Sequence, residues 1–289
     1  MKILAFGEII WDVFPDKRCI GGAPLNFAAH SAALGADSYI LSAVGEDALA
    51  APAKKALSDF AVSDKYVGLS TLPTGRCDVS LDINGIPSYS LLDNTAYDDI
   101  KIPKGIENEH FDAVCMGTLS IRHSTSRKTL EKLLEYKIAD EFFADVNIRA
   151  PHFTKENIIL LLENSSILKI SDEELPVVMS AVFSEEGKSI EECAKFISDR
   201  YENIKIIIIT LGAKGAYAFD CKEKKEYKQK PYEAEVLSTV GAGDSFGAAF
   251  LVKYLSGNPI SECLDFASRL SALVVSKTEA IPKYDPENL

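Results

Sequence analysis

The stretch Ser238-Thr239-Val240-Gly241-Ala242-Gly243-Asp244-Ser245-Phe246-Gly247 places a glycine-rich turn directly before a helix. After it, apolar residues recur at helical spacing as far as Leu255, and before it Glu235-Val236-Leu237 predicts a short strand. Gly241 and Gly243 lack a Cβ atom, so a ligand can approach the backbone closely. The first N–H groups of a helix have no partner within it, and the helix dipole adds partial positive charge there. The stretch therefore predicts an anion-binding site.

Asp244 stands at the same helix start, and two interpretations of it are open. An acidic residue in the first turn often only caps the helix, which stabilises it by about 0.5–2 kcal/mol. Beside an anion site, a carboxylate can instead accept the proton of an attacking hydroxyl group, as phosphoryl transfer requires. The preceding glycines favour the second interpretation.

Length and composition limit the class of protein. A chain of 289 residues, 47% hydrophobic and 26% charged, is typical of one large α/β domain or of a domain with a small appendage. A net charge of −12 repels nucleic acid and anionic membranes, so neither is an expected partner. The six cysteines form no CxxC pair, which is typical of reduced thiols in the cytoplasm. The first seven residues predict a strand rather than a signal sequence, and no apolar run approaches the ~18 residues of a membrane span.

Strand-like and helical segments alternate along most of the chain. Strands are predicted at 2–7, 38–44, 111–116, 141–146, 166–170 and 205–210, and helices at 26–34, 47–60, 124–136, 154–163, 172–182, 187–201 and 260–276. Residues 11–18 are expected to be irregular or extended, 21–24 to form a loop, and 217–230 to form a hairpin at the sheet edge. The run Ile206-Ile207-Ile208-Ile209 must be buried on both faces. This order predicts an α/β fold with a mostly parallel sheet and helices on both sides.

The segment from Gly75 to Leu92 has a different pattern. Apolar and polar residues alternate from Cys77 to Asn84, and Asn84-Gly85 is a strong hairpin turn. Strands with one polar face are typical of an antiparallel sheet. The sequence therefore predicts a small separate sheet, which is suited to cover a site.

Other common site motifs are absent. The chain has no GxxxxGK[ST] sequence, and Gly241-x-Gly243-x-x-x-Gly247 is one residue too long for the dinucleotide fingerprint. Its four histidines form no HExxH motif and no close pair. A P-loop enzyme, a dehydrogenase and a zinc site are therefore disfavoured.

The stretch from Ser238 to Gly247 resembles the C-terminal signature of the PfkB (ribokinase-like) carbohydrate kinases, usually written DTxGAGDxF. The N-terminal signature is similar to Gly21-Gly22-Ala23-Pro24-Leu25-Asn26-Phe27-Ala28 with the later 34–36 and 44–47. Further matches lie at 7–12, 73–75, 117–122, 145–149 and 210–215, and those at 117–122 and 145–149 are most similar to bacterial fructokinases. The resemblance spans nearly the whole chain. It implies a single ribokinase-like domain, 1–289, with a lid formed by about 10–20 and 72–98.

The resemblance also implies roles around the helix start. Asp244 is expected to be the general base for the sugar hydroxyl group. The backbone N–H groups of Ala242, Gly243 and Asp244, which follow Gly241, are expected to form an anion hole for the developing charge.

Five further positions are expected to bind the sugar, namely Asp12, Gly22, Asn26, Asn147 and Arg149. Carboxylate, amide and guanidinium groups suit a ring of hydroxyl groups. Without the resemblance, Asn26 reads as a helix cap, Asp12 as a solvated acid and Arg149 as a surface ion-pair residue.

On the nucleotide side, the resemblance implies ATP contacts from Lys169, Ser171, Thr210, Gly212, Gly215 and Gly243. Glu174 is expected to act on Mg²⁺ through water, and its alternative interpretation is a helix N-terminal acid. The chain departs from the family at three places. Ser238 replaces an Asp that helps bind a monovalent cation, Ser171 replaces an Asn, and Glu279-Ala280 replaces a Gly-Ala pair. The first and third departures put potassium activation in question.

The sequence thus predicts an ATP-dependent sugar kinase that phosphorylates a primary hydroxyl group, with fructose as the favoured acceptor. Kinases of 2-keto-3-deoxygluconate, ribose or a nucleoside are alternatives, because selectivity depends on pocket shape. A catalytically silent sugar-binding protein on the same fold is the alternative from another class. A homodimer through the lid is compatible with the small sheet.

Overall fold

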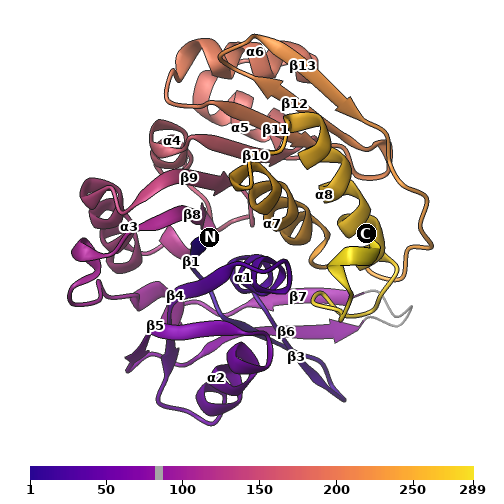
Figure 1. Cartoon of the computed structure of the whole chain (residues 1–289). Coiled ribbons are helices and arrows are strands. Elements are labelled where there is room, and N and C mark those ends of the chain that lie inside the picture. The colour runs from indigo at the N-terminus through magenta and orange to yellow at the C-terminus, as the bar shows by residue number, and fades with distance from the viewer. Residues whose placement is uncertain (82–86) are drawn as a thin grey trace.

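Nine strands form one sheet within residues 1–81 and 87–289, which are the residues that the computed structural model describes (Figure 1). Their order is β13-β12-β11-β10-β9-β8-β1-β4-β5. The bounds are β1 (Lys2–Phe6), β4 (Asp37–Gly45), β5 (Val62–Ser70), β8 (Phe111–Gly117), β9 (Ala139–Asp145), β10 (Ile167–Ser171), β11 (Ile206–Thr210), β12 (Ala216–Asp220) and β13 (Lys225–Gln229). All neighbours pair in parallel except β11–β12 and β12–β13, which are antiparallel. The mostly parallel sheet and its edge hairpin are confirmed.

Helices cover both faces of this sheet. One layer holds α1 (Ala23–Ala33), α2 (Ala50–Asp59), α7 (Ala242–Leu255) and α8 (Ile260–Val275). The other holds α3 (Ser124–Tyr136), α4 (Lys155–Asn164), α5 (Leu175–Val178) and α6 (Ile190–Arg200). Strand β11 serves both cores, because Ile207 and Ile209 face one layer while Ile206 and Ile208 face the other. This explains why its sequence is apolar without alternation.

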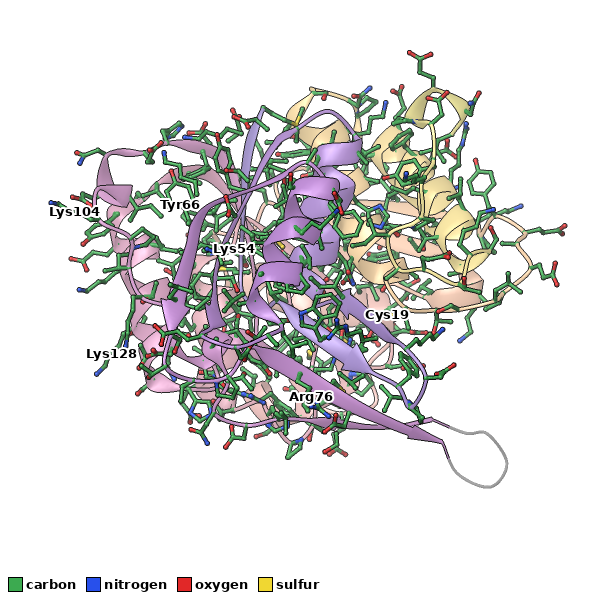
Figure 2. The ribbon with its side chains drawn as sticks, turned by 90° about the horizontal axis from the view of Figure 1, so that it is seen from below. Cys19, Lys54, Tyr66, Arg76, Lys104 and Lys128 are labelled. Atoms are coloured by element: carbon green, nitrogen blue, oxygen red, sulfur yellow. The ribbon has the colours of Figure 1, made fainter. Side chains whose placement is uncertain are left out.

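A second sheet of four strands, in the order β3-β2-β6-β7, stands beside the large one (Figure 1). Its strands are β2 (Ile10–Val13), β3 (Arg18–Gly21), β6 (Gly75–Leu81) and β7 (Pro87–Leu91). Seen from below, β3 with Cys19 and β6 with Arg76 lie in this sheet (Figure 2). The predicted small sheet is confirmed. The region 11–18, expected to be irregular or extended, supplies most of β2 and the first residue of β3. The predicted Asn84-Gly85 turn lies outside the described residues.

The entry of the chain into β6 is fixed by Thr74. Its backbone N–H and its hydroxyl group donate to the carboxylate of Asp47 at 2.7 and 2.8 Å, and its hydroxyl oxygen accepts from the Gly45 N–H at 2.9 Å. Thr74 is buried. The two sequence matches at 44–47 and 73–75 therefore meet in space and attach the small sheet to β4.

The exit from β7 is fixed by Arg122. This buried guanidinium group donates to Asp98 Oδ1 and Oδ2 at 2.7 and 2.8 Å and to the Leu92 carbonyl at 2.7 Å. It also lies over the ring of Tyr97, 5.0 Å from the centroid. A bidentate, buried pair of this kind is among the stronger side-chain interactions.

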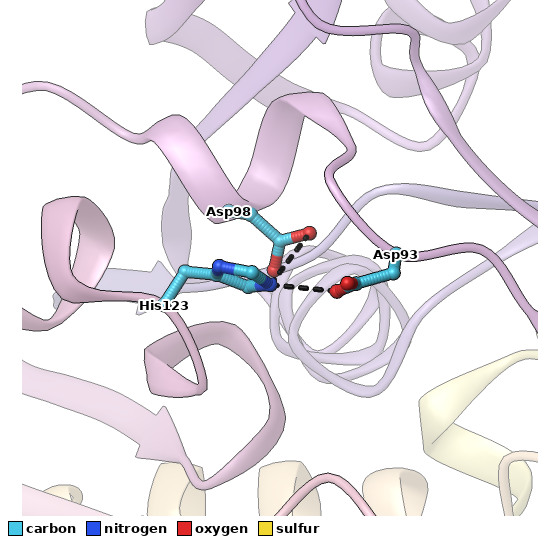
Figure 3. A group of neighbouring side chains, drawn as sticks. All are labelled: Asp93, Asp98 and His123. Atoms are coloured by element: carbon cyan, nitrogen blue, oxygen red, sulfur yellow. Dashed lines mark hydrogen bonds and ion pairs between the residues drawn. The ribbon is translucent and has the colours of Figure 1, made fainter.

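A histidine and two acids lie together at this exit (Figure 3). The Nε2 atom of His123 is 2.6 Å from Asp93 Oδ1 and 4.0 Å from Asp98 Oδ2. The spacing would suit a metal ion, but Asp98 already accepts from Arg122 and from the backbone N–H of Thr95 at 2.9 Å. The Arg122 guanidinium group thus supplies the positive charge that a metal would bring. The two acids and His123 form an ion-pair network with it.

Several predicted elements differ in the structure. Residues 235–237 are not a strand: they are largely exposed, and the amides of Leu237 and Ser238 both donate to the Val275 carbonyl at the end of α8. The helix predicted at 172–182 begins only at Leu175, because 172–174 form a turn, and it ends in a π-helical turn, Met179–Phe183. Helix α1 begins at Ala23, inside the expected loop. Strand β5 was not predicted.

Among the described residues, none of the helices combines the length and the apolar character needed to cross a bilayer.

His30 joins α1 to the C-terminal segment. Its Nε2 atom lies 2.9 Å from the Ala280 carbonyl, and its Nδ1 atom lies 2.9 Å from the Tyr284 hydroxyl group. Because a carbonyl only accepts, Nε2 carries the proton and Nδ1 accepts from Tyr284. Burial lowers the pKa of His30 to about 4. The folded state therefore holds this imidazole neutral.

We expect His30 to make stability depend on pH. Between pH 6.5 and 4 the unfolded state binds the extra proton, so the free energy of unfolding falls as pH decreases, by about 3 kcal/mol in all. His30→Gln lacks this contribution, so its free energy of unfolding should fall less as pH decreases. The difference in unfolding free energy between wild type and variant should therefore narrow from pH 6.5 to pH 4. Urea unfolding at pH 7.5 and 4.5 measures it, with the exposed His110→Gln as control. A difference that does not change with pH would contradict the assignment.

Candidate active site

The candidate residues gather where the sheet order reverses. Strand β1 lies between β4, which follows it in the chain, and β8, which comes much later. In open α/β sheets, ligands bind beyond the carboxyl ends of the strands at such a reversal. A small pocket of about 20 Å³ lies there, enough for one water molecule. Its lining includes Glu8, Pro24, Thr118, Asp145 and Asn147.

The start of α7 has the geometry of an anion hole. Gly241 precedes the helix in the left-handed conformation, with φ 81°. The amide of Ala242 donates to the Thr239 carbonyl at 3.3 Å, whereas the amides of Gly243 and Asp244 have no acceptor among the described residues. Two of the three expected N–H groups are thus available to an anion.

Asp244 is held by α1. The amide Nδ2 of Asn26 donates to Asp244 Oδ2 at 2.8 Å, across 218 residues of sequence. Burial raises the pKa of Asp244 above its ordinary value, while Asn26 and the positive charges of Lys169 and Arg149 act against the rise. The group is therefore a stronger base than an exposed carboxylate and is oriented by a partner.

Asn26 and Asp12 offer acceptors at one place. Asn26 is buried, and its Oδ1 atom has no hydrogen-bond partner among the described residues. A Cβ atom on Gly21 would lie 3.8 Å from both Asn26 Oδ1 and Asp12 Oδ2, so these oxygens flank the same glycine. A buried acceptor without a donor is costly unless a ligand supplies one. A sugar hydroxyl group is such a donor.

Arg149 carries the free positive charge of this region. It is exposed, and it has no ion pair among the described residues. Its charge lowers the pKa values of Asp12, Asp244 and Glu8 relative to burial alone, which places the guanidinium group near all three. It is therefore well placed to bind a polar or anionic group of the substrate.

Asn147 lines the pocket, and Gly22 lies against Glu8, another lining residue. Gly22 has φ 109°, and a Cβ atom there would lie 2.5 Å from the Glu8 carbonyl oxygen. Asn147 also adopts a left-handed conformation, with φ 42°, directly after β9. A residue with a Cβ atom at position 22 would strain the backbone there. Asn147 already has a strained conformation, which its neighbours must hold in place.

A buried ion pair lies next to the anion hole. The ammonium group of Lys169 is 2.9 and 2.8 Å from Asp145 Oδ1 and Oδ2, and both residues are buried. A Cβ atom on Gly243 would lie 3.3 Å from Lys169 Nζ, so the positive charge sits against the helix start. Burial raises the pKa of Asp145 to about 6. Burial lowers the pKa of Lys169, but Asp145, Glu174 and Asp244 outweigh it and raise the net value.

The other expected nucleotide residues follow β10 and β11. Ser171 ends β10, and Thr210 ends β11 with its carbonyl accepting from the Asp172 N–H at 2.9 Å. Gly212 has φ 54° with open space on its Cβ side. Gly215 has φ 101° and packs tightly against the Gln229 backbone, so the turn into β12 explains this glycine without a ligand.

Glu174 is fully engaged with protein donors. Its Oε1 accepts from the Ile148 N–H at 2.6 Å, and its Oε2 accepts from the Ser171 N–H and hydroxyl group, both at 2.9 Å. A carboxylate whose two oxygens face three donors does not fit direct coordination of a divalent ion. Direct coordination of a metal ion by Glu174 is therefore disfavoured, and its expected role through water stays a prediction.

Ser238, where the chain departs from the family signature, lies in a turn directly before Gly241. The Ser238 hydroxyl oxygen accepts from the Val240 N–H at 3.2 Å, so it caps the turn before Gly241. Val236, Leu237 and Val240 are exposed apolar residues in this segment, 63%, 56% and 48% accessible. Apolar side chains beside an anion site offer a surface on which an aromatic base can pack.

Sequence reasoning left three residues of the site without a role. Glu8 and Asp145 are buried acids that line the pocket, and Thr118 donates to the loop after β9. Burial, with Asp244 nearby, raises the pKa of Glu8 to about 7. The available signal was position, since Glu8 and Thr118 directly follow the runs that form β1 and β8, and Asp145 ends β9.

Comparison with known proteins places the chain among carbohydrate kinases. The model of the pfkB family of carbohydrate kinases matches residues 6–287. A probable fructokinase of Arabidopsis thaliana is 24% identical, covering 99% of this chain and 94% of its own. A ribokinase of the same plant is 28% identical, covering 91% and 68%. A sugar kinase of Pyrococcus horikoshii, solved in complex with ATP, superposes with a TM-score of 0.83 at 26% identity, covering 99% and 96%.

The chain belongs to the pfkB family of carbohydrate kinases. It is therefore a sugar kinase, a phosphotransferase whose acceptor is a hydroxyl group. Its fold is the ribokinase-like one that the sequence predicted.

We expect Gly241→Ala to disable the anion hole. The left-handed φ costs about 1–2 kcal/mol for a residue with a Cβ atom. That atom would also lie 2.6 Å from the Ala280 carbonyl oxygen, so the turn must move. Loss of a positioned oxyanion donor lowers kcat about 100-fold or more.

Gly257→Ala is the matched control, because Gly257 ends the same helix region with φ 83° and open space around it. It should lose about 1–2 kcal/mol of stability and retain kcat. Steady-state kinetics and thermal unfolding of both variants test this. Equal activities in the two variants would refute the role of Gly241.

Proposed function

We propose that this protein transfers the γ-phosphoryl group of ATP to a primary hydroxyl group of a sugar, with Asp244 as the general base. One observation carries the proposal: the Asp244 carboxylate, fixed by Asn26 at 2.8 Å, stands beside two unpaired amides at the start of α7. A base and an anion hole at the same helix start are the two groups that hydroxyl attack on a phosphoryl group requires.

The chemistry follows from these positions. The sugar oxygen attacks the γ-phosphorus while its proton passes to Asp244, and the bond from that phosphorus to the bridging oxygen of ADP breaks. The N–H groups of Gly243 and Asp244 stabilise the charge on the transferred group. Lys169, against Gly243, adds fixed positive charge from a buried position. Kinases of this family use ATP together with a divalent metal ion, which would add positive charge at the phosphates.

Fructose is the favoured acceptor. Asp12 and the free Oδ1 of Asn26 accept from hydroxyl groups, and the backbone turn at Gly22 and the side chains of Asn147 and Arg149 complete the sugar side. Fructokinase relatives support this choice. An acidic sugar such as 2-keto-3-deoxygluconate is the second candidate, because Arg149 is an exposed cation that matches a carboxylate.

The small sheet is proposed to act as the lid. Asp12 lies opposite Cys19 and Cys77 in neighbouring strands, so these side chains share the face that points to Asn26. Trp11, on the other face, donates to the Leu49 carbonyl at 3.2 Å. Closure of the remaining strands over the sugar would exclude water as a competing acceptor. A homodimer through this sheet stays a prediction.

ADP release across a panel of fructose, 2-keto-3-deoxygluconate, ribose and nucleosides tests the function. Fructose should give the highest kcat/KM. Because Ser238 caps its own turn, omission of K⁺ should change the rate little. Absence of turnover with every sugar, together with measurable sugar binding, would favour a silent binding protein instead.

We expect Asp244→Asn to lower kcat about 100- to 10,000-fold, the usual contribution of a general base. Asn26 can still bond to the amide oxygen at this position, so sugar affinity should change less than threefold. Kinetics and calorimetric sugar binding measure the two quantities. Asp265→Asn, at a half-buried acid paired with Arg269, is the control. Retention of kcat in Asp244→Asn would exclude this residue as the base.

The pH dependence of kcat should report the environment of Asp244. Only the ionised carboxylate accepts a proton, so activity falls as pH decreases through its pKa. Asn26→Leu removes a hydrogen bond that lowers this pKa, so the acid limb of the profile should move to higher pH. The pKa values of Asp145 and Glu8 are also raised. The acid limb of the pH profile therefore reports the joint titration of Asp244, Asp145 and Glu8. A limb that stays in place or moves to lower pH would contradict the role of Asn26.

A further inference from the structure

We propose that Glu174 and Thr118 are positioning residues that clamp the loop 146–149, which carries Asn147 and Arg149. This inference rests on the proposed function, because it assigns the two residues to sugar binding. It differs from the expected role of Glu174, which was at the nucleotide.

Few interactions within the loop 146–149 fix its conformation. Residues 146–149 follow β9 without regular structure, and they lie between Asp145, which pairs with Lys169, and a turn closed by the His152 N–H on the Arg149 carbonyl at 2.6 Å. Asn147 sits in the left-handed region with φ 42°. Such a conformation costs about 1–2 kcal/mol for a non-glycine residue and persists only when neighbours enforce it.

Two neighbouring strands supply that enforcement. From the end of β8, the buried Thr118 hydroxyl group lies 2.8 Å from the Val146 carbonyl and 3.3 Å from the Asn147 carbonyl. From the turn after β10, Glu174 Oε1 accepts from the Ile148 N–H at 2.6 Å. The bonds fall on consecutive residues, so they fix the peptide planes on both sides of Asn147.

The carboxylate of Glu174 is itself held rigidly. Its Oε2 accepts from the Ser171 N–H and hydroxyl group, and its own N–H donates to Ser171 Oγ at 3.2 Å. This is the reciprocal pattern of a capping box. Ser189 and Glu192 form the same pattern at the start of α6. In the 171–174 turn, however, the carboxylate has a further bond, to Ile148, and this bond is what the box orients.

The consequence concerns Arg149. Its charge lowers the pKa values of Asp12 and Asp244, yet its side chain has no hydrogen-bond partner among the described residues, so its position depends on the path of the loop. Release of the Ile148 bond would let Asn147 relax, and the sugar would lose Asn147 and Arg149 together. Glu174 therefore acts on sugar affinity through the backbone.

The direct test is sugar binding in metal-free buffer without nucleotide, measured by calorimetry with the favoured acceptor of the panel. Glu174→Ala and Thr118→Val should each weaken the sugar Kd about tenfold. Glu174→Gln keeps an oxygen for the Ile148 N–H, so its Kd should stay within about threefold of the wild type. A role of Glu174 that needs metal or nucleotide would leave all these Kd values unchanged, which would overturn the proposal.

Matched controls are available. Thr129→Val removes a buried hydroxyl group that donates to the Ile100 carbonyl at 2.7 Å, and Glu192→Ala removes the carboxylate of the other capping box. Both should leave sugar Kd unchanged. Weakening equal to that of Thr118→Val and Glu174→Ala would show a general loss of stability and reject the clamp.

Hydrogen exchange at the Ile148 amide separates this inference from the proposed function. Glu174→Ala should speed exchange there at least tenfold, and Glu174→Gln should not. If the wild type binds no sugar, the proposed function fails, but the exchange result still decides the clamp. Unchanged exchange in Glu174→Ala would refute it whatever the substrate is.

Discussion

The site depends on the hydrogen bond between Asn26 and Asp244. It joins the first turns of α1 and α7, which pack side by side on one face of the sheet (Figure 1). The Asn26 amide nitrogen donates to Asp244, while its buried oxygen has no partner in the part of the chain that the structure describes, so one side chain can orient the proposed base and accept from a substrate. Gly22 and Gly241 immediately precede the two helices, both have positive φ, and neither has room for a Cβ atom. The C-terminal segment completes the arrangement, because His30 and Gly241 both contact the Ala280 carbonyl.

Buried charge is the second constraint. Glu8, Asp145 and Asp244 are carboxyl groups of one small region, and burial raises the pKa of each. Three carboxylates would repel one another, but Lys169 pairs with Asp145, and the charge of Arg149 lowers the pKa values of Glu8 and Asp244. The chain as a whole carries a net charge of −12, so anionic ATP must bind against the global field. The free amides of α7 and the Lys169 ammonium group supply the local positive potential that this requires.

The sequence was sufficient for the sheet, the helix layers and the small sheet, because apolar periodicity reports burial directly. It was also sufficient to predict the helix that begins after Gly241 and carries Asp244 in its first turn. It failed where a contact between distant segments decides the structure. Residues 235–237 have the composition of a strand, but their amides bond to the end of α8. Nothing in the sequence indicates that the Ile148 N–H donates to Glu174, which joins the loop after β9 to the turn after β10. Lys169 and Asp145 stood apart in the sequence until parallel pairing placed β10 beside β9.

In the proposed mechanism, the acceptor hydroxyl group lies between the Asp244 carboxylate and a γ-phosphate that the N–H groups of Gly243 and Asp244 bind. A crystal structure with the sugar and a non-hydrolysable ATP analogue tests it most directly. The account predicts the primary hydroxyl oxygen about 3 Å from an Asp244 carboxylate oxygen, with the γ-phosphate at the start of α7. A sugar bound with another atom at Asp244, or a γ-phosphate away from these amides, would contradict it.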